Sequence, residues 1–160
     1  MKNIIIYSTK YGSVKKCAEL LKSKLKDETI IFDTKEKSSP DISNFDNIIL
    51  GGSIYAGRMQ SSLKKFIEKN INVLLQKNVA LFSCSGAQDT EGESYIKNNF
   101  PEELYNHAVA KELFGSELFF NMLNPLEKFA IKMITKSTDD VKNIKEENIE
   151  KLAKKINDLK

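Results

Sequence analysis

The sequence predicts an α/β protein with a doubly wound, five-stranded, mainly parallel sheet in a three-layer α/β/α arrangement. Short apolar runs rich in β-branched residues alternate with segments whose apolar residues recur at helical spacing. Glycines and small polar residues follow three of these apolar runs, as expected where strands of a parallel sheet end beside a ligand. The chain has 160 residues, so we expect a single domain spanning residues 1–160.

The first two strands are expected close to the start of the chain. Residues 3–8 read NIIIYS, a continuous apolar run typical of a strand buried on both faces. Residues 29–33, TIIFD, are the second strand. A helix is expected between them, with Ser13 as its N-cap. Its apolar face is formed by Val14, Cys17, Ala18, Leu21 and Leu25.

The remaining three strands are expected at residues 47–53, 78–85 and 108–115. A helix between the third and the fourth is indicated by the apolar positions Leu63, Phe66, Ile67, Ile71 and Leu74. A polar loop and a mostly helical stretch to about His107 lead to the fifth strand. A closing helix is marked by Ile149, Leu152, Ala153 and Ile156. This alternation predicts parallel strands joined by covering helices.

Cysteine and histidine content argues against a metal site. Cys17 and Cys84 lie far apart in the sequence and match no metal-binding or redox spacing. Since His107 is the chain's one histidine, a zinc site of cysteines and histidines is not expected. We interpret both cysteines as small hydrophobic residues.

Charge and hydropathy argue against nucleic acid as a partner and against a membrane-spanning segment. The net charge is +3, and the lysines are scattered without an arginine-rich tract, so no nucleic-acid partner is expected. No stretch approaches the 18 consecutive apolar residues that a membrane-spanning helix needs. We therefore expect a cytoplasmic protein.

The loop STKYGSV joins the first strand to the first helix and has the features of an anion site. It lies at the carboxyl end of a strand and at the positive end of a helix dipole. Ser8, Thr9 and Ser13 offer hydroxyl donors, Lys10 adds a cation, and Gly12 permits close approach. The loop has neither the P-loop pattern nor the three-glycine dinucleotide pattern, which favours a single phosphate. An ordinary capped helix start is the alternative.

Two further loops are expected at the same edge of the sheet. The third strand ends in GGSIYAG, where Tyr55 provides a flat ring and Gly51, Gly52 and Gly57 leave space. The fourth ends in SCSGAQD, which is again small and polar. Together the three loops predict a phosphate pocket beside a slot for a planar heterocycle. Tyr55 could instead cover the edge of the core.

The stretches IIIYSTKYGSVKKCAELL, IILGGSIYAGRMQSSLKKFI and VALFSCSG resemble flavodoxin-type FMN domains. They are most similar to the flavodoxin-like protoporphyrinogen dehydrogenases, which pass electrons to a quinone. The resemblance implies a flavodoxin-like fold and FMN as the cofactor. It implies that the FMN phosphate is bound by Thr9, Lys10, Tyr11, Gly12, Ser13 and Val14, together with the preceding Ser8. Those that it implies beside the isoalloxazine are Ser53, Ile54, Tyr55, Ala56, Gly57, Ser85, Gly86 and Ala87.

Three functions are compatible with this pattern. The first is an FMN-dependent oxidoreductase that oxidises protoporphyrinogen IX or a related donor and reduces a quinone. The second is a flavodoxin that carries electrons between redox proteins, and the third is a flavodoxin-like module without flavin. The net charge of +3 favours the enzyme, because electron carriers of this type tend to be acidic. No catalytic residue can be assigned from the sequence.

Residues 116–140 form a segment that a minimal electron carrier does not need. Asn124 and Pro125 indicate a helix start. The helix then has one apolar and one basic side, formed respectively by Leu126, Phe129, Ala130, Met133 and Ile134 and by Lys128, Lys132 and Lys136. Such a helix can lie on an anionic membrane, where a lipid quinone is found, and this interpretation predicts peripheral contact at the inner membrane face. A helix that simply covers the sheet is the alternative.

Overall fold

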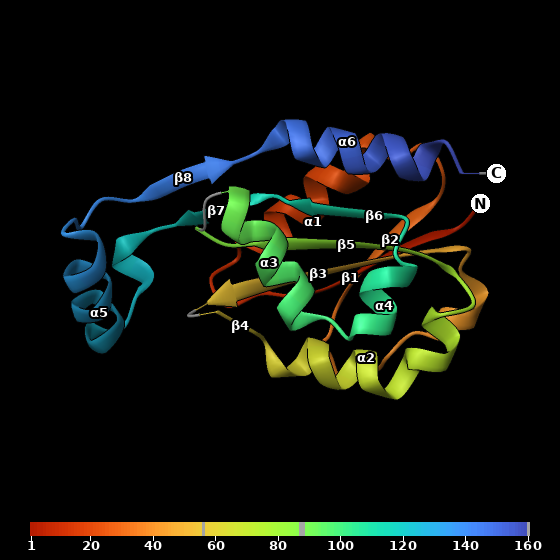
Figure 1. Ribbon diagram of the computed structural model, residues 1–160, viewed down its shortest axis with the longest axis horizontal. Helices are drawn as coiled ribbons and strands as arrows, with labels where there is room; N and C mark the ends of the chain where they lie inside the picture. The colour runs from red at the N-terminus through yellow and green to blue at the C-terminus, as the bar shows by residue number, and fades with distance from the viewer. Residues whose placement is uncertain (56, 87–88, 160) are drawn as a thin grey trace.

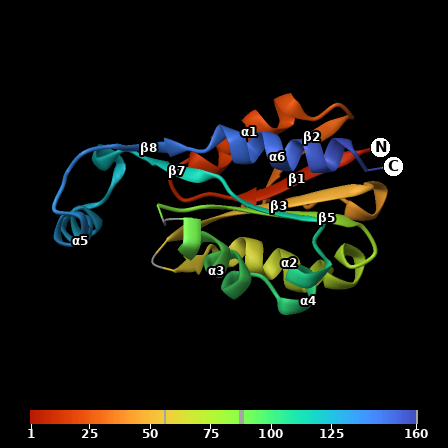
Figure 2. The ribbon, with the colours of Figure 1, turned by 45° about the horizontal axis from the view of Figure 1, so that its top comes forward.

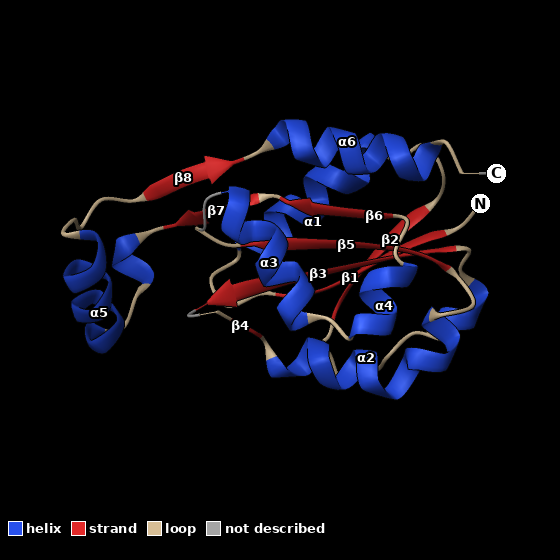
Figure 3. Ribbon diagram, in the orientation of Figure 1, coloured by secondary structure: helices blue, strands red, loops and turns tan. Residues whose placement is uncertain are grey.

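The computed structural model describes residues 1–55, 57–86 and 89–159. Its main sheet has five parallel strands in the order β2–β1–β3–β5–β6 (Figures 1 and 3). Their bounds are β1 (Asn3–Ser8), β2 (Thr29–Asp33), β3 (Asn47–Tyr55), β5 (Asn78–Cys84) and β6 (Ala110–Leu113). The short β4 (Arg58–Met59) pairs antiparallel with the end of β3. The predicted doubly wound parallel sheet is thus confirmed, with its switch of strand order between β1 and β3.

The register of the central strands aligns their two ends. At the amino end, Asn47 donates a hydrogen bond to Asn3 Oδ1 (2.7 Å), and Asn78 donates to Asn47 Oδ1 (2.9 Å). At the carboxyl end, Ser8 lies opposite Gly52, and Ser53 lies opposite Cys84. The loops that follow β1, β3 and β5 therefore leave the sheet side by side.

Helices cover both faces of the sheet, as Figure 2 shows. One face carries α1 (Ser13–Lys24) and α6 (Glu146–Asn157). The other carries α2 (Ser61–Leu74), α3 (Asp89–Asn99) and α4 (Glu102–His107). Neighbouring residues of β1 alternate between the two cores, since Ile4 and Ile6 pack in one cluster and Ile5 packs in the other. This confirms the three-layer arrangement.

The fifth predicted strand is shorter than expected and is followed by a second strand. The structure ends β6 at Leu113, and Gly115 has a positive φ of 71°. A Cβ atom at Gly115 would lie 1.8 Å from the carbonyl oxygen of Asn143, so only glycine fits there. The chain then continues as β7 (Gly115–Leu118), which pairs antiparallel with β8 (Val141–Ile144).

Residues 115–144 form an arm that projects beyond the carboxyl ends of the strands (Figures 1 and 2). Between β7 and β8 it contains a short 3₁₀ turn, η2 (Phe120–Met122), and helix α5 (Pro125–Thr135). The predicted helix start is confirmed: Glu127 N–H donates to Asn124 Oδ1 (2.9 Å), and Asn124 N–H donates to Glu127 Oε2 (3.1 Å). The β7–β8 pair was not expected from the sequence.

The alternative in which this helix covers the sheet is wrong. Its apolar side is exposed, with 80% of Leu126, 65% of Phe129 and 66% of Met133 accessible to solvent. As far as the described residues go, neither core cluster contains a residue of α5. The side chain of Ile134, which was expected on the same side, lies outside the described residues. Within the part of the chain that the structure describes, no helix is long and apolar enough to cross a bilayer.

Candidate functional site

A cavity of about 90 Å³ lies at the carboxyl edge of the sheet, where the three predicted loops meet. It is enclosed by the ends of β1, β3 and β5 and by the first residues of the arm. Its lining consists of Thr9, Lys10, Tyr11, Ser13, Ser53, Ile54, Tyr55, Cys84, Ser85, Gly86, Ser116, Glu117 and Leu118. This position, beside the switch of strand order, is where doubly wound sheets bind ligands.

The start of α1 is open toward this cavity. Gly12 occupies the N-cap position with φ 91°, and within the described residues no side chain caps the helix. The amide groups of the first turn have no acceptor inside the helix, and no acidic residue stands in that turn. The unpaired amides and the helix dipole together favour an anion here.

Ser13 is not the N-cap, contrary to the sequence prediction. It is the first residue of α1, and its Oγ accepts a hydrogen bond from the backbone N–H of Glu117 (3.0 Å). The cap position itself is stabilised by Thr9, whose Oγ1 accepts from Gly12 N–H (2.9 Å). The glycine takes this place because a left-handed backbone conformation is required there.

Two buried hydroxyl groups lie at the ends of β3 and β5, beside the cavity. Ser53 Oγ and Ser85 Oγ are buried and lack a hydrogen bond among the residues that the structure describes. Both serines line the cavity. Because buried polar atoms in folded proteins nearly always have a partner, these two indicate that a polar ligand completes the site.

Two tyrosine rings and a lysine meet at the rim of the cavity. The ring centroids of Tyr11 and Tyr55 are 6.3 Å apart in an edge-on arrangement. Lys10 Nζ lies 5.1 Å from the Tyr11 centroid and 4.3 Å from the Tyr55 centroid, within the range of cation–π contact. The rim thus offers aromatic surface to a planar ligand, as the sequence predicts for Tyr55.

Two ion pairs tie the arm to the loop and helix at the cavity. Lys10 Nζ contacts Glu127 Oε1 (2.5 Å), and Lys16 Nζ contacts Glu117 Oε2 (2.9 Å). The hydrogen bond from Lys10 lowers the pKa of Glu127 to about 2, and the same bond raises the pKa of Lys10. Since Lys10 belongs to the first loop and Glu127 to α5, the position of the arm and the shape of the rim depend on one another.

Most of the sequence-predicted site residues meet in the cavity. Those in its lining are Thr9, Lys10, Tyr11, Ser13, Ser53, Ile54, Tyr55, Ser85 and Gly86. Gly12 and Gly57 are outside the lining, although both have the positive φ values that loops of this kind require. Ala56 and Ala87 lie outside the described residues.

Ser8 and Val14 face away from the cavity. Ser8 is fully buried, and its Oγ shares a hydrogen bond of 2.8 Å with Ser62 Oγ. Val14 is fully buried in the core between α1 and the sheet. Neither side chain lines the site, so their contribution is to fix the loop and the helix in place.

The sequence interpretation missed the contribution of the arm to the cavity. Ser116, Glu117 and Leu118 belong to β7 and line the cavity beside the start of α1, where Glu117 contacts Ser13 and Lys16. Their position directly after the fifth strand was the available signal, because the carboxyl ends of all parallel strands lie at one edge. The sequence alone did not reveal that the chain turns at Gly115 and returns along this edge.

The two cysteines are free and buried. They neighbour each other between α1 and β5, and burial, with a smaller effect of Cys17, raises the pKa of the Cys84 thiol. Cys84 therefore remains a protonated thiol at neutral pH, although it lines the cavity. Among the described residues, no group of three histidine, cysteine, aspartate or glutamate side chains could hold a metal ion.

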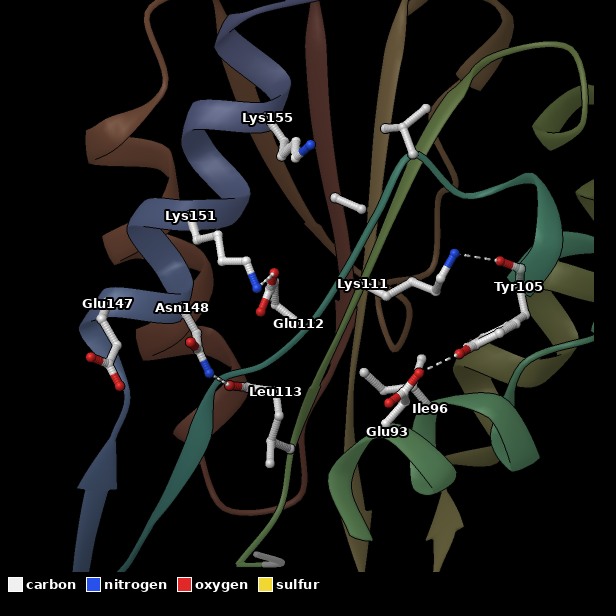
Figure 4. A pocket seen from close by; sticks show the side chains of 12 residues that line it. Glu93, Ile96, Tyr105, Lys111, Glu112, Leu113, Glu147, Asn148, Lys151 and Lys155 are labelled. Atoms are coloured by element: carbon white, nitrogen blue, oxygen red, sulfur yellow. Dashed lines mark hydrogen bonds and ion pairs between the residues drawn. The ribbon is translucent and has the colours of Figure 1, made fainter. Parts of the chain in front are cut away.

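A larger groove of about 520 Å³ runs along β6, between α6 and helices α3 and α4 (Figure 4). Several of its polar groups already have partners. Lys151 contacts Glu112 (2.7 Å), Lys111 donates to the carbonyl of Tyr105 (3.0 Å), and Asn148 donates to the carbonyl of Leu113 (2.8 Å). Despite its size this groove is a less suitable ligand site than the carboxyl-edge cavity, where the hydroxyls of Ser53 and Ser85 lack a partner among the described residues.

Comparison with known proteins identifies a family match over most of the chain. A model of the flavodoxin domain matches residues 4–145. Protoporphyrinogen IX dehydrogenase [quinone] from Escherichia coli strain K12 is 30% identical over 88 residues, which cover 53% of this chain and 49% of that protein. The same protein from E. coli O157:H7 matches equally. The chain thus spans about half the length of the curated relatives it matches.

Solved structures share the fold at low sequence identity. Oxidised flavodoxin 1 from Bacillus cereus has a TM-score of 0.62 with 14% identity, and the match covers 100% of both chains. Two-electron reduced flavodoxin from Megasphaera elsdenii has a TM-score of 0.58 with 16% identity, over 69% of this chain and 84% of that one. A flavoprotein from Lactobacillus acidophilus in complex with FMN has a TM-score of 0.53 with 18% identity, over 71% and 90%.

Proposed function

This chain belongs to the flavodoxin domain family, and from that premise we propose that it binds FMN at the carboxyl-edge cavity and acts as an oxidoreductase. One observation carries the proposal. The open N-terminus of α1 and the unpaired hydroxyls of Ser53 and Ser85 converge on the same cavity. The amides suit a phosphate, and the hydroxyls suit the polar edge of a ring system.

The residues of the cavity divide into two groups by the part of FMN that they would hold. The amides at the start of α1, with Thr9 and Ser13, would bind the phosphate. Ser53, Tyr55 and Ser85 would hold the ring system. FMN, when bound, supplies the electron-transfer chemistry, while the protein supplies binding, orientation and access.

The cavity must widen for this ligand. Its volume of about 90 Å³ is well below the roughly 300–1,000 Å³ of sites for ligands of comparable size. The obstruction is local, because Lys10 lies over the faces of Tyr11 and Tyr55. Rotation of these three exposed or half-exposed side chains opens the rim without a change in the sheet.

For the reaction, we propose oxidation of protoporphyrinogen IX or a related donor, with a quinone as acceptor. The partial match to the E. coli dehydrogenases supports this choice. So does the net charge of +3, which differs from the acidic surface expected of an electron carrier that docks on basic partners. A lipid quinone resides in the membrane, so the proposal also implies peripheral contact at the inner membrane face.

The test begins with cofactor binding. The purified protein is titrated with FMN, riboflavin and FAD, and binding is followed by quenching of flavin fluorescence and by absorption. We expect binding of one FMN per chain, weaker binding of riboflavin, and no preference for FAD. Failure to bind FMN would overturn the proposal.

The second part of the test distinguishes the enzyme from the carrier. The FMN-loaded protein is mixed anaerobically with protoporphyrinogen IX and a menaquinone analogue, and porphyrin fluorescence is recorded. Turnover supports the enzyme. Reduction of a partner redox protein faster than of any quinone would instead identify an electron carrier.

A further inference from the structure

We propose that the exposed face of α5 is a docking surface for anionic lipid, which holds the arm on a membrane. Leu126, Phe129 and Met133 form this surface together with the flanking Lys132 and Lys136, and we call these five residues the docking face. It lies outside the cofactor cavity.

The exposure of the docking face is unusual for a folded protein. Leu126 is 80% accessible, Phe129 65% and Met133 66%, and the three side chains recur at three- and four-residue spacing on one side of the helix. Large exposed apolar residues that gather in one patch mark an interaction site more often than scattered ones do. The arm holds α5 clear of the sheet and its covering helices (Figures 1 and 2).

The charge beside the patch identifies its occupant. Phe129, Met133, Lys132 and Lys136 together line a groove of about 370 Å³ on the surface of α5. A groove with apolar and cationic walls matches the acyl chain and the phosphate of one anionic lipid. Interfacial helices bind membranes through this combination, with the apolar side buried at the level of the head groups.

A second copy of the chain fits this surface less well than lipid does. Two docking faces brought together would gather Lys132 and Lys136 of both copies in one interface. The protein as a whole carries a net charge of +3, which adds to that repulsion. An anionic membrane removes the conflict, because its charge is opposite.

Docking through α5 would also place the cavity near the membrane. Glu127 follows Leu126 directly, and its contact with Lys10 attaches the helix to the rim of the cavity. This placement would give the cavity access to a lipid quinone, and only that advantage rests on the proposed function. Lipid binding itself needs neither FMN nor turnover.

The experiment measures co-sedimentation of the full chain with phosphatidylcholine vesicles, with and without phosphatidylglycerol. One variant, Lys132→Gln with Lys136→Gln, removes two charges from the docking face. Its matched control, Lys154→Gln with Lys155→Gln, removes the same charge from exposed positions of α6. A third variant, Phe129→Ser with Met133→Ser, removes the apolar part.

We expect the unaltered chain to bind the anionic vesicles, with an affinity that falls as salt rises. Each lysine near an anionic surface strengthens binding about fivefold, so the α5 lysine variant should bind about 25-fold more weakly. The α6 control should bind almost as well as the unaltered chain. The Phe129→Ser, Met133→Ser variant should also bind weakly, although its folding is unchanged.

Three results would overturn the inference. They are no binding to anionic vesicles, equal loss of binding in the α5 and α6 lysine variants, and a dimer in sedimentation velocity that Phe129→Ser with Met133→Ser dissolves. The last would identify a second copy as the occupant. FMN titration of the same proteins reports separately on the proposed function, so failure of one proposal does not conceal failure of the other.

Discussion

Helices α5 and α6 have similar sequence patterns and opposite environments. Both carry apolar residues at helical spacing together with several lysines. In α5 the expected separation into an apolar and a basic side is wrong, because Lys132 and Lys136 line one groove with Phe129 and Met133. In α6, Leu152 is fully buried and Ile156 is 1% exposed, because this helix packs beside α1 over the sheet. In α5, Leu126 is 80% exposed, because the arm carries the helix past the end of the sheet.

The contrast shows what an amphipathic period does and does not predict. The period identifies which side of a helix is apolar. It carries no information about what lies against that side, which depends on where the connecting strands place the helix. For α5 those strands are β7 and β8, two short strands that the sequence pattern did not indicate.

The sharpest test applies one substitution to both helices. Leu152→Ala in α6 should lower the free energy of unfolding by about 2–5 kcal/mol, because it leaves a cavity in a packed core. Leu126→Ala in α5 should change it by less than about 0.5 kcal/mol, because the side chain is exposed in the folded state too. Urea unfolding followed by circular dichroism measures both. Similar losses in the two variants would mean that α5 packs against the domain.

A second test asks whether FMN binding depends on the loops of the main sheet or on the arm. Ser13→Asp adds a negative charge at the open start of α1 and should weaken FMN binding about 10- to 100-fold, with a smaller effect on riboflavin. Leu126→Ala should leave FMN affinity unchanged. Ser61→Asp, at the start of α2 and outside the cavity lining, controls for charge at a helix start. An equal loss for FMN and riboflavin in Ser13→Asp would show that this loop does not hold phosphate.

A third test needs no mutation and compares how readily methionines of the arm and of the packed core are oxidised. Met133 in α5 is 66% exposed and Met122 in η2 of the arm is 54% exposed, whereas Met59 in β4 is 5% exposed. Limited treatment with hydrogen peroxide should convert the two arm methionines to sulfoxide before Met59. Peptide mapping by mass spectrometry gives the order. Oxidation of Met59 at the same rate would contradict the packing described for the domain.

A small effect on stability is also expected at the ion pair between the arm and the first loop. Lys10→Gln should lower the free energy of unfolding by no more than about 1 kcal/mol, since the Lys10–Glu127 pair lies at the surface. The pKa of Glu127 should rise from about 2 toward its ordinary value of 4.5, which NMR of the carboxyl carbon measures. A pKa that stays low without Lys10 would show that another group holds this carboxylate.

The sign of the pH dependence follows from the lowered pKa of Glu127. A carboxyl group with a depressed pKa in the folded state stabilises the protein fully above its unfolded pKa. The contribution of Glu127 is therefore present at neutral pH and is lost as the pH falls from about 4.5 toward 2. Release of the arm should precede unfolding of the sheet within this range.

The sheet could be predicted from the sequence because its strands are buried on both faces. Continuous apolar runs such as residues 3–8 have few alternatives to a central strand, and β1 has those bounds. The strands of the arm could not be predicted in this way. The residues of β8 are exposed or half-exposed, and its pairing with β7 depends on the turn at Gly115.

The site likewise contains residues that could be predicted from the sequence and residues that could not. Thr9, Tyr55 and Ser85 were predicted because they follow apolar runs whose ends align in a parallel sheet. Ser13 was expected at the N-cap of α1, but Gly12 occupies that position. The loop requires a left-handed backbone conformation there, and the residue preferences of N-caps do not indicate this requirement. Glu117 and Glu127 reach the site from far along the chain, and their contacts with lysines have no local signal.

Glu127 has two partners at very different sequence separations, and this sets the order in which the arm can assemble. Its bond with Asn124 joins residues three apart, so the first turn of α5 can form as soon as these residues leave the ribosome. Its bond with Lys10 spans 117 residues and requires the β1 loop to be in place. We therefore expect α5 to form early and to attach late, after the sheet has folded. During synthesis the chain would then carry a helical α5 that has not yet formed its contact with the β1 loop.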